Sequence, residues 1–521
     1  MYHVHTGFTR PCHLLYCYPK APLPDAGVSL HLGTMDADVD MIDPDFPWQD
    51  YGDIPEEVLE QMMQQYQDYY GGGEFGFEEP PAQVFSYAEH FANCVVPTLT
   101  QGIQIITPLV FGCMAMRTVS LMGLPAAFYH LLSLTVGILA LSYFFEGLII
   151  QVVALGLLGY FLLQACQASD INYKGPVSAA VFVMVLVIWE LFFADPVEWN
   201  KIRGSQMILV MKVISLAFDL DQGVVEEVPE FLAYLGYTFN LATVIFGPWI
   251  SFSAYLRLLH PGGDIELRWL LTAFVKFLQS LVCLLISTCV APVLFLGFDQ
   301  KWLDAYKDAM SFRFSHYFVS FVSESTSLAL GLGAPREGGN KYWELNVARP
   351  WHIELPRSLV QVVTNWNLPM HVWLKNYVFK TSRKFGNFAA VLLTYAASSL
   401  LHGLNFQLAA VLLSLGFYSY IEHVFRQKLA SIFNACILAR RCKQDCQHLH
   451  QSTHPLVMLT NLCFGLLAMF HLAYLGVMFN SEEELQEKGY EMEHTLKKWS
   501  HLDYASHYVA ATTFVFYWLI K

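Results

Sequence analysis

His402 ends an apolar stretch, residues 389–402, that holds no other acidic or basic side chain. An ionisable side chain inside a membrane is costly, so one that persists there is a candidate for function. A histidine can act as a general base because its pKa lies near neutral pH. The alternative is a hydrogen-bonded core histidine. His130, His316 and His471 also lie in or beside apolar runs, so position alone does not identify the catalytic histidine.

Asn367 is a second candidate for chemistry, in the segment Thr364–Met370. Pro369 prevents a regular helix at this point and restricts the residue before it. An amide beside a helix break can donate a hydrogen bond to a carbonyl that gains negative charge. The alternative interpretation is a helix cap, a position that asparagine favours.

A third pattern, Cys442-x3-Cys446-x-His448-x-His450, contains ligand types that bind zinc. Zinc fingers separate their ligand pairs much further, and a basic loop explains the segment equally well, so no metal is predicted. The chain has 11 cysteines in irregular positions, which predicts no disulfide framework. We expect buried thiols that act as small hydrophobes at the cysteines in or beside apolar stretches: Cys94, Cys113, Cys166, Cys283, Cys289 and Cys463.

The composition indicates that much of this chain faces lipid rather than water. Hydrophobic residues make up 55% of the 521 residues and charged residues only 14%, whereas soluble domains carry about 25% charged residues. The formal net charge of −14 arises from residues 1–90, which contain 16 acidic and two basic residues. The remaining chain is therefore neutral, which excludes a basic nucleic-acid-binding surface. Residues 1–84 are predicted to be a disordered acidic extension.

The rest, residues 85–521, is predicted to be one all-α polytopic membrane domain with about eleven transmembrane helices. The mixed segments 205–219 and 310–333 are expected to be tilted, broken or re-entrant, and buried among other helices. The apolar runs are 102–116, 119–144, 147–167, 176–195, 229–256, 268–298, 386–401, 405–421, 455–479 and 503–520.

Basic residues suggest which connections are cytoplasmic. One cluster, Lys380 to Lys384, precedes the run 386–401, and a second follows the run 405–421. If both are cytoplasmic, the two runs between them cross the membrane as a hairpin. The second cluster is assigned to a loop and comprises Arg426, Lys428, Arg440, Arg441 and Lys443.

Several long strings of residues resemble the membrane-bound O-acyltransferase family, and within it the branch that acylates serine in proteins. The strings occur in order over roughly residues 85–521, and the acidic extension is not part of the resemblance. They are residues 211–219, 244–252, 354–370, 373–379, 394–403, 471–476 and 498–502.

This resemblance implies a multi-pass enzyme of the endoplasmic reticulum membrane that transfers a palmitoleoyl group from palmitoleoyl-coenzyme A to a serine of Wnt proteins. It implies no bound cofactor. His402 matches the invariant histidine of the family, and Asn367 matches its polar partner. Asn367 could donate to the carbonyl that gains negative charge or hold His402 in the correct tautomer, and the sequence does not decide between these two roles. Trp366, Trp373 and Tyr377 are candidates to line a substrate path, although packing explains each of these aromatic residues equally well.

Two other classes of function compete with an acyltransferase. A lipid transporter would use His402 and Asn367 as binding groups without chemistry. A chaperone for a secreted ligand would keep its function after loss of His402. Only an enzyme would transfer the acyl group covalently.

Overall fold

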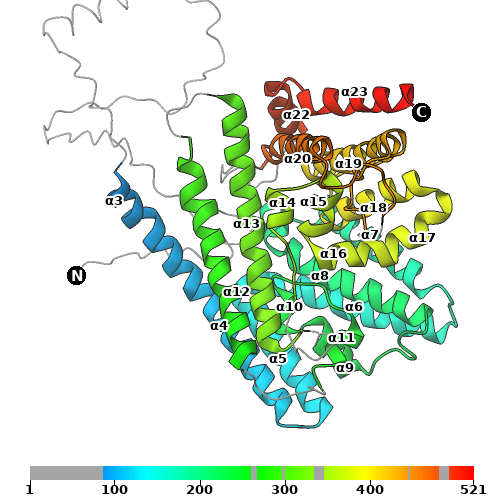
Figure 1. Cartoon of the computed structure of the whole chain (residues 1–521). Helices are drawn as coiled ribbons and strands as arrows, with labels where there is room; N and C mark the ends of the chain where they lie inside the picture. Colours follow the sequence, from blue (N-terminus) through cyan, green and yellow to red (C-terminus); the bar gives the residue numbers. More distant parts are fainter. Residues whose placement is uncertain (1–85, 260–266, 296–299, 334–344, 444–445, 480–491) are drawn as a thin grey trace, which may run out of the picture. The chain divides into compact units, whose positions relative to one another are not determined.

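A computed structural model describes residues 86–259, 267–295, 300–333, 345–443, 446–479 and 492–521 (Figure 1). The predicted disordered extension, residues 1–84, lies outside the described residues. Contacts divide the chain into two units. Of the smaller unit, residues 22–93, the structure describes α3 and the first residues of η1. The packing and the sites described below lie in residues 94–521.

The described residues are helical, and their one β-type pairing is a single bridge between Ala435 and His450. This confirms the predicted all-α class. The helices are α3 (Tyr87–His90), η1 (Phe91–Val95), α4 (Val96–Leu121), α5 (Ala126–Phe145), η2 (Glu146–Leu148), α6 (Ile149–Ala168), α7 (Lys174–Phe192), α8 (Pro196–Asp221), α9 (Phe231–Thr238), α10 (Leu241–Val244), α11 (Phe252–Leu256), α12 (Leu267–Leu285), η3 (Ile286–Val290), η4 (Ala291–Val293), α13 (Lys301–Leu330), α14 (Trp351–Glu354), α15 (Leu359–Trp366), α16 (Leu368–Trp373), η5 (Leu374–Phe379), α17 (Lys380–Ser382), η6 (Arg383–Phe385), α18 (Asn387–Leu401), α19 (Phe406–Phe433), α20 (Pro455–Gly476), α22 (Met492–His501) and α23 (Ala505–Leu519).

Six helical stretches of the described residues are long and apolar enough to cross a membrane. One of them, Ala126–Ala168, is two helices, because α5 ends at Glu146, where φ is 48°, before α6 begins. The other stretches contain α4, α7, α12, α19 and α20. With the shorter or more polar helices α8, α13, α18 and α23, the candidates reach the predicted number of about eleven.

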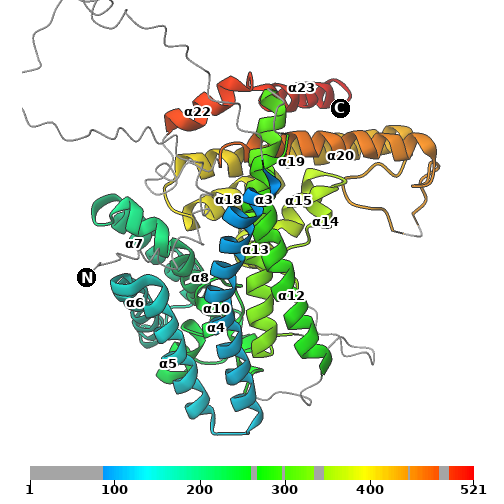
Figure 2. The same ribbon diagram turned by 90° about the vertical axis from the view of Figure 1, so that its left-hand side faces the viewer.

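Helix α13 is a continuous helix of 30 residues. The expectation that 310–333 is broken or re-entrant is therefore wrong, although its predicted burial is confirmed. The mixed composition has another cause: α13 packs against α4, α12 and α20 and buries polar side chains among them. Figures 1 and 2 show α4 and α12 running beside it. Segment 205–219 likewise lies within the continuous helix α8.

The apolar run 229–256, predicted to cross the membrane, is instead divided into the short helices α9, α10 and α11. The buried Lys212 of α8 replaces the missing helical hydrogen bonds. Its ammonium group donates to the carbonyls of Tyr237 and Thr238 and to the Thr243 hydroxyl, at 2.7–3.1 Å. Hydropathy cannot reveal this break, because a buried lysine on another helix satisfies the backbone.

A disulfide joins Cys94 and Cys289, which lie 195 residues apart in the sequence. The prediction of free thiols is therefore wrong for these two cysteines. It holds for Cys113, Cys166 and Cys283, which are free and buried, while the free Cys463 is exposed. Spacing along the chain could not identify the pair, because packing of η3 near the start of α4 brings the two together.

Helices α18 and α19 pack as the predicted hairpin, joined by residues 402–405. Helix α19 continues to Phe433, well beyond the predicted end at 421. Arg426 is consequently not a loop residue. It is completely buried within α19, where it pairs with Glu422 at 2.9 Å.

Candidate functional site

His402 follows the last residue of α18 at the tip of the α18–α19 hairpin. Its backbone N–H donates to the Ser399 carbonyl at 3.0 Å, which closes the end of the helix. Gly403 has a φ of +89°, and a Cβ added there would lie 2.8 Å from a Glu190 carboxylate oxygen. Glu190 of α7 also accepts from the Leu404 N–H at 2.8 Å. The turn after His402 therefore requires glycine and is held by α7.

The length of α18 bears on the depth of His402. Fifteen residues of α-helix extend about 22 Å, which is less than the roughly 30 Å of a bilayer hydrocarbon core. The helix begins at Asn387, next to the basic residues of η6. Helix α18 alone is therefore too short to span the hydrocarbon core, and His402 lies at its end.

The His402 imidazole is half-buried and has no hydrogen-bond partner among the described residues. Arg203 of α8 and His316 of α13 lie near enough to interact with it electrostatically. By contrast, His130 is hydrogen-bonded to the Tyr255 hydroxyl and His471 to the Ser506 hydroxyl. These two are core histidines, as expected, whereas the nitrogens of His402 are available to a ligand.

Asn367 separates α15 from α16 and is extended there, with φ −145° and ψ 95°. Its side-chain oxygen accepts from the Met370 N–H at 3.0 Å and caps α16. This hydrogen bond also identifies the oxygen of the amide, because a backbone N–H requires an acceptor. The amide nitrogen has no partner among the residues that the structure describes. Asn367 is thus a cap through its oxygen and keeps a donor for a ligand.

His316 connects the neighbourhoods of the two predicted catalytic residues. Its Nε2 lies 2.9 Å from the carbonyl oxygen of Trp366, the residue before Asn367. The His316 and Trp366 rings are stacked, with centroids 4.3 Å apart, and His316 also acts on His402. The sequence predicts only a core role for His316, because nothing in the chain relates α13 to α15.

Of the three predicted lining residues, Trp366 is half-buried, while Trp373 and Tyr377 are packed against α8. The Trp373 indole donates to the Met211 carbonyl at 3.0 Å, and the Tyr377 hydroxyl donates to Asp219 at 2.9 Å. These contacts favour packing for Trp373 and Tyr377. Their place in the substrate path stays a prediction.

Helix α13 positions the segment that carries Asn367. Glu324 accepts from the Val347 N–H at 2.6 Å and pairs with Lys276 at 2.7 Å. The Val347 carbonyl in turn accepts from the Leu368 N–H at 2.7 Å. Two successive hydrogen bonds therefore link the buried Glu324 carboxylate of α13, through Val347, to Leu368, the residue after Asn367.

A second contact from α13 fixes α14, which precedes α15. Arg313 donates two hydrogen bonds to Glu354, at 2.8 and 3.0 Å, and Tyr317 donates a third at 2.7 Å. A bidentate pair of this kind fixes orientation as well as distance. The sequence gives no sign of either contact, because the partners lie far apart in the chain.

A cavity of about 420 Å³ lies beside α14, α15 and the loop that follows α19. Two basic residues, Arg357 and Arg441, contribute to its wall, with Asn461 of α20. Neither His402 nor Asn367 lines it. The cavity is therefore distinct from the surroundings of the two predicted catalytic residues.

Comparison with known proteins places these features in a family. The sequence model of the membrane-bound O-acyltransferase family matches residues 138–436, which include both Asn367 and His402. The protein-serine O-palmitoleoyltransferase porcupine of Homo sapiens is 43% identical over 461 residues, which cover 84% of this chain and 99% of that protein. The enzyme of the same name from Drosophila melanogaster is 33% identical over 501 residues, covering 87% of this chain and 92% of that protein. The human membrane-bound glycerophospholipid O-acyltransferase 1 is 23% identical over 323 residues, covering 53% and 64%.

Proposed function

The chain belongs to the membrane-bound O-acyltransferase family, and we propose that it transfers a palmitoleoyl group from palmitoleoyl-coenzyme A to a serine of Wnt proteins. The observation that carries the proposal is the 43% identity that extends over 99% of the human protein-serine O-palmitoleoyltransferase. The likeness to the glycerophospholipid acyltransferase is weaker and shorter, so a protein acceptor is favoured over a lipid. None of the three relatives named above is a lipid transporter or a chaperone.

The proposed reaction begins at the serine hydroxyl. His402 takes its proton as the oxygen attacks the thioester carbonyl, a role for which an imidazole nitrogen without a protein partner is suited. The carbonyl oxygen becomes negative in the tetrahedral intermediate, and the Asn367 amide donates a hydrogen bond to it. The C–S bond then breaks, and the proton held by His402 passes to the coenzyme A sulfur. The products are an oxygen ester of serine and free coenzyme A.

The two substrates reach the enzyme from different compartments. Coenzyme A is cytosolic and a secreted acceptor is lumenal, so the enzyme would work in the endoplasmic reticulum membrane with access to its site from both faces. Helix α18, which is too short to cross the hydrocarbon core and has His402 at its end, supports such an arrangement. A hydrophobic path shaped to a cis double bond would select the palmitoleoyl chain over a straight saturated chain.

The test uses the purified full chain with labelled palmitoleoyl- or palmitoyl-coenzyme A in direct competition. The acceptor is a disulfide-stapled peptide from a Wnt hairpin, compared with the same peptide carrying alanine in place of serine. We expect covalent, hydroxylamine-labile label on the serine peptide only, with palmitoleoyl-coenzyme A preferred. Length selection should be graded, because a hydrophobic pocket discriminates by about 1–3 kcal/mol per methylene.

Three outcomes would contradict parts of the proposal. Equal use of both donors would remove the selection for a bent chain. Label on the alanine peptide would remove the serine ester. Acylation of glycerolipids or sterols without peptide acylation would exclude a protein acceptor while leaving the family assignment intact.

A further inference from the structure

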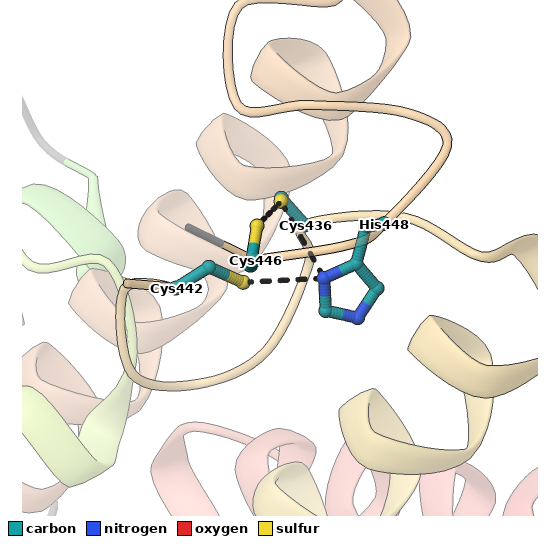
Figure 3. A group of neighbouring side chains, drawn as sticks. All are labelled: Cys436, Cys442, Cys446 and His448. Carbon is teal, nitrogen blue, oxygen red and sulfur yellow. Dashed lines mark hydrogen bonds between the residues drawn. The ribbon is translucent and has the colours of Figure 1, made fainter. Parts of the chain in front are cut away.

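The loop between α19 and α20 brings three cysteines and a histidine to one point (Figure 3). These are Cys436, at the end of the turn after α19, and Cys442, Cys446 and His448 further along the loop. Their three sulfurs and one imidazole nitrogen all lie within 4.8 Å of one another. None of these residues has a part in the proposed reaction.

The distances match the edges of a metal-centred tetrahedron. Zn–S bonds of about 2.3 Å and Zn–N bonds of about 2.0–2.1 Å place sulfur and nitrogen ligands about 3.6 Å apart. The Nδ1 atom of His448 lies 3.7 Å from the sulfurs of both Cys436 and Cys442. The sulfurs of Cys436 and Cys446 lie 3.3 Å apart, compared with about 3.8 Å between sulfurs in such a site. The remaining ligand pairs lie within 4.8 Å, so small shifts of the side chains would admit the ion.

The surroundings of the four side chains hold their backbone in place. The Gln451 amide donates to the carbonyls of Cys446 and His448, at 3.2 and 2.8 Å. The Cys436 N–H donates to the His450 carbonyl at 2.9 Å, so the two ends of the loop are paired. The ligand atoms thus converge on a loop with its own hydrogen-bonded frame.

We propose that this loop binds a structural Zn²⁺ through the thiolates of Cys436, Cys442 and Cys446 and through Nδ1 of His448. Three thiolates and one imidazole are a ligand set that zinc prefers. Four protein ligands leave no open position, which is typical of structural rather than catalytic sites. Each thiol loses its proton to solvent when the ion binds, and no oxidation or reduction takes place.

A disulfide between Cys436 and Cys446 is the competing state, since their sulfurs are close. It would leave Cys442 and His448 without a role. The basic residues Arg440, Arg441 and Lys443 favour a cytoplasmic loop, and disulfides are rare on that side of the membrane. Both considerations favour the metal.

The site differs from the pattern visible in the sequence. His450, the last member of the predicted Cys-Cys-His-His motif, is not a ligand: its ring packs against His454, with centroids 4.9 Å apart. Its place is taken by Cys436, which stands before the motif. The sequence predicts no metal because zinc fingers separate their ligand pairs further and a basic loop explains the segment equally well. The pairing of the loop ends, which brings Cys436 to the site, is not visible in the sequence.

The loop is bonded to the segment that begins α15, which ends at Asn367. Arg357 donates to the Cys436 carbonyl at 2.7 Å, and the Ser358 hydroxyl donates to the Ala439 carbonyl at 2.9 Å. Ser358 is also the N-cap of α15. An ion that fixes Cys436 therefore stabilises the start of the helix that carries Asn367 at its other end.

The experiment measures metal content in the purified full-length protein, prepared with a mild reductant and without chelator. Mass spectrometry of the metal should find about one zinc per chain in the wild type, as a closed four-ligand site requires. Cys442→Ser, Cys446→Ser and His448→Ala should each lose most of it. The matched controls His450→Ala and Cys463→Ser should retain it, because His450 lies in the same loop without being a ligand and Cys463 is a free thiol on α20.

A second measurement does not depend on any variant folding. The wild-type protein is treated with a chelator and then supplied with Co²⁺, which should produce the thiolate-to-cobalt and tetrahedral absorption bands of a thiolate-rich site. Absence of these bands, or a zinc content that is equal in the wild type and the Cys442→Ser and Cys446→Ser variants, would overturn the proposal. So would a wild-type protein that contains no zinc and in which peptide mapping without reductant finds a disulfide between Cys436 and Cys446.

Discussion

The nitrogens of His402 are used differently from those of the other buried histidines. His130, His316 and His471 each have a hydrogen-bond partner within the protein, and His402 has none among the described residues. A base must accept a proton from its substrate, so a free nitrogen is the property that the reaction needs. Burial separates His402 from His130 and His471 but not from His316, which is also half-buried.

His402→Ala should abolish acyl transfer while leaving expression and acyl-coenzyme A binding largely intact. The change removes the proton acceptor, and general-base catalysis commonly contributes about 10²–10⁴-fold to a rate. Turnover of labelled donor onto the serine peptide measures the effect. The control is His130→Asn, whose amide can keep the hydrogen bond with Tyr255 and should preserve turnover. Near-normal turnover of His402→Ala would exclude a general base at this position.

The acceptor oxygen and the donor nitrogen of the Asn367 amide can be tested separately by substitution. Asn367→Asp keeps the oxygen that accepts from the Met370 N–H but loses the donor, whereas Asn367→Ala loses both. If the donor stabilises the oxyanion, both variants should lose about 10²–10³-fold in turnover, and only Asn367→Ala should also lose the cap of α16. A thermal melt alongside the assay distinguishes the effects. If the Asn367→Asp enzyme is active, Asn367 only caps α16 and does not donate to the oxyanion.

Single residues with a strong local signal could be predicted from the sequence, and residues with a distant partner could not. His402 and Asn367 stand in recognisable strings, so both were candidates before the structure was known. His316 and Glu190 act on that neighbourhood from α13 and α7, and nothing in their own segments shows this. Cys94, Cys289 and Cys436 were missed for the same reason.

At the scale of elements, α19 is joined to α15 through one buried guanidinium. Arg426 donates to the carbonyls of Arg357 and Ile437, both at 2.7 Å, and pairs with Glu422. Glu422 in turn accepts from the Leu359 N–H at 2.7 Å, at the first turn of α15. These contacts place the helix that ends at Asn367 against the hairpin that carries His402.

Removal of this guanidinium should destabilise the protein strongly. Arg426→Met leaves Glu422 buried without its partner, which costs about 3–5 kcal/mol in comparable pairs. Its melting temperature and turnover should therefore both fall. Lys428→Ala serves as the control on the same helix, because its ammonium group makes only an exposed contact with the carbonyl of Lys521. If the melting temperature of Arg426→Met equals those of Lys428→Ala and the wild type, the guanidinium does not hold α15 and α19 together.

The boundaries of elements followed hydropathy only where helices face lipid. Helices such as α7 and α20 are predominantly apolar, and the sequence predicts them well. Helix α13 packs on several neighbours and carries buried polar groups such as Glu324, so its composition resembles that of a broken segment. The run 229–256 shows the reverse case, since its apolar residues line three short helices that Lys212 caps.

At the scale of the whole molecule, the net charge and the family match lie in different parts of the chain. The net charge of −14 arises from the first 90 residues, and the remainder is neutral. The human relative is covered over 99% of its length by 84% of this chain, and the family match begins at residue 138. The acidic extension therefore lies outside the part of the chain that the family model matches.

Deletion of residues 1–84 should leave specific activity unchanged, because the predicted catalytic residues and the helices that hold them all lie in residues 85–521. The truncated enzyme, beginning at Phe85, is assayed beside the full chain with the same donor and serine peptide, and both are normalised to the amount of folded protein. The melting temperatures should also agree, because the extension is predicted to be disordered. Because the extension carries the net charge of −14, both proteins are assayed at an ionic strength that screens it. If the specific activity of the truncated enzyme falls more than tenfold while its melting temperature is unchanged, the extension takes part in catalysis. If the specific activity and the melting temperature both fall, the extension takes part in folding.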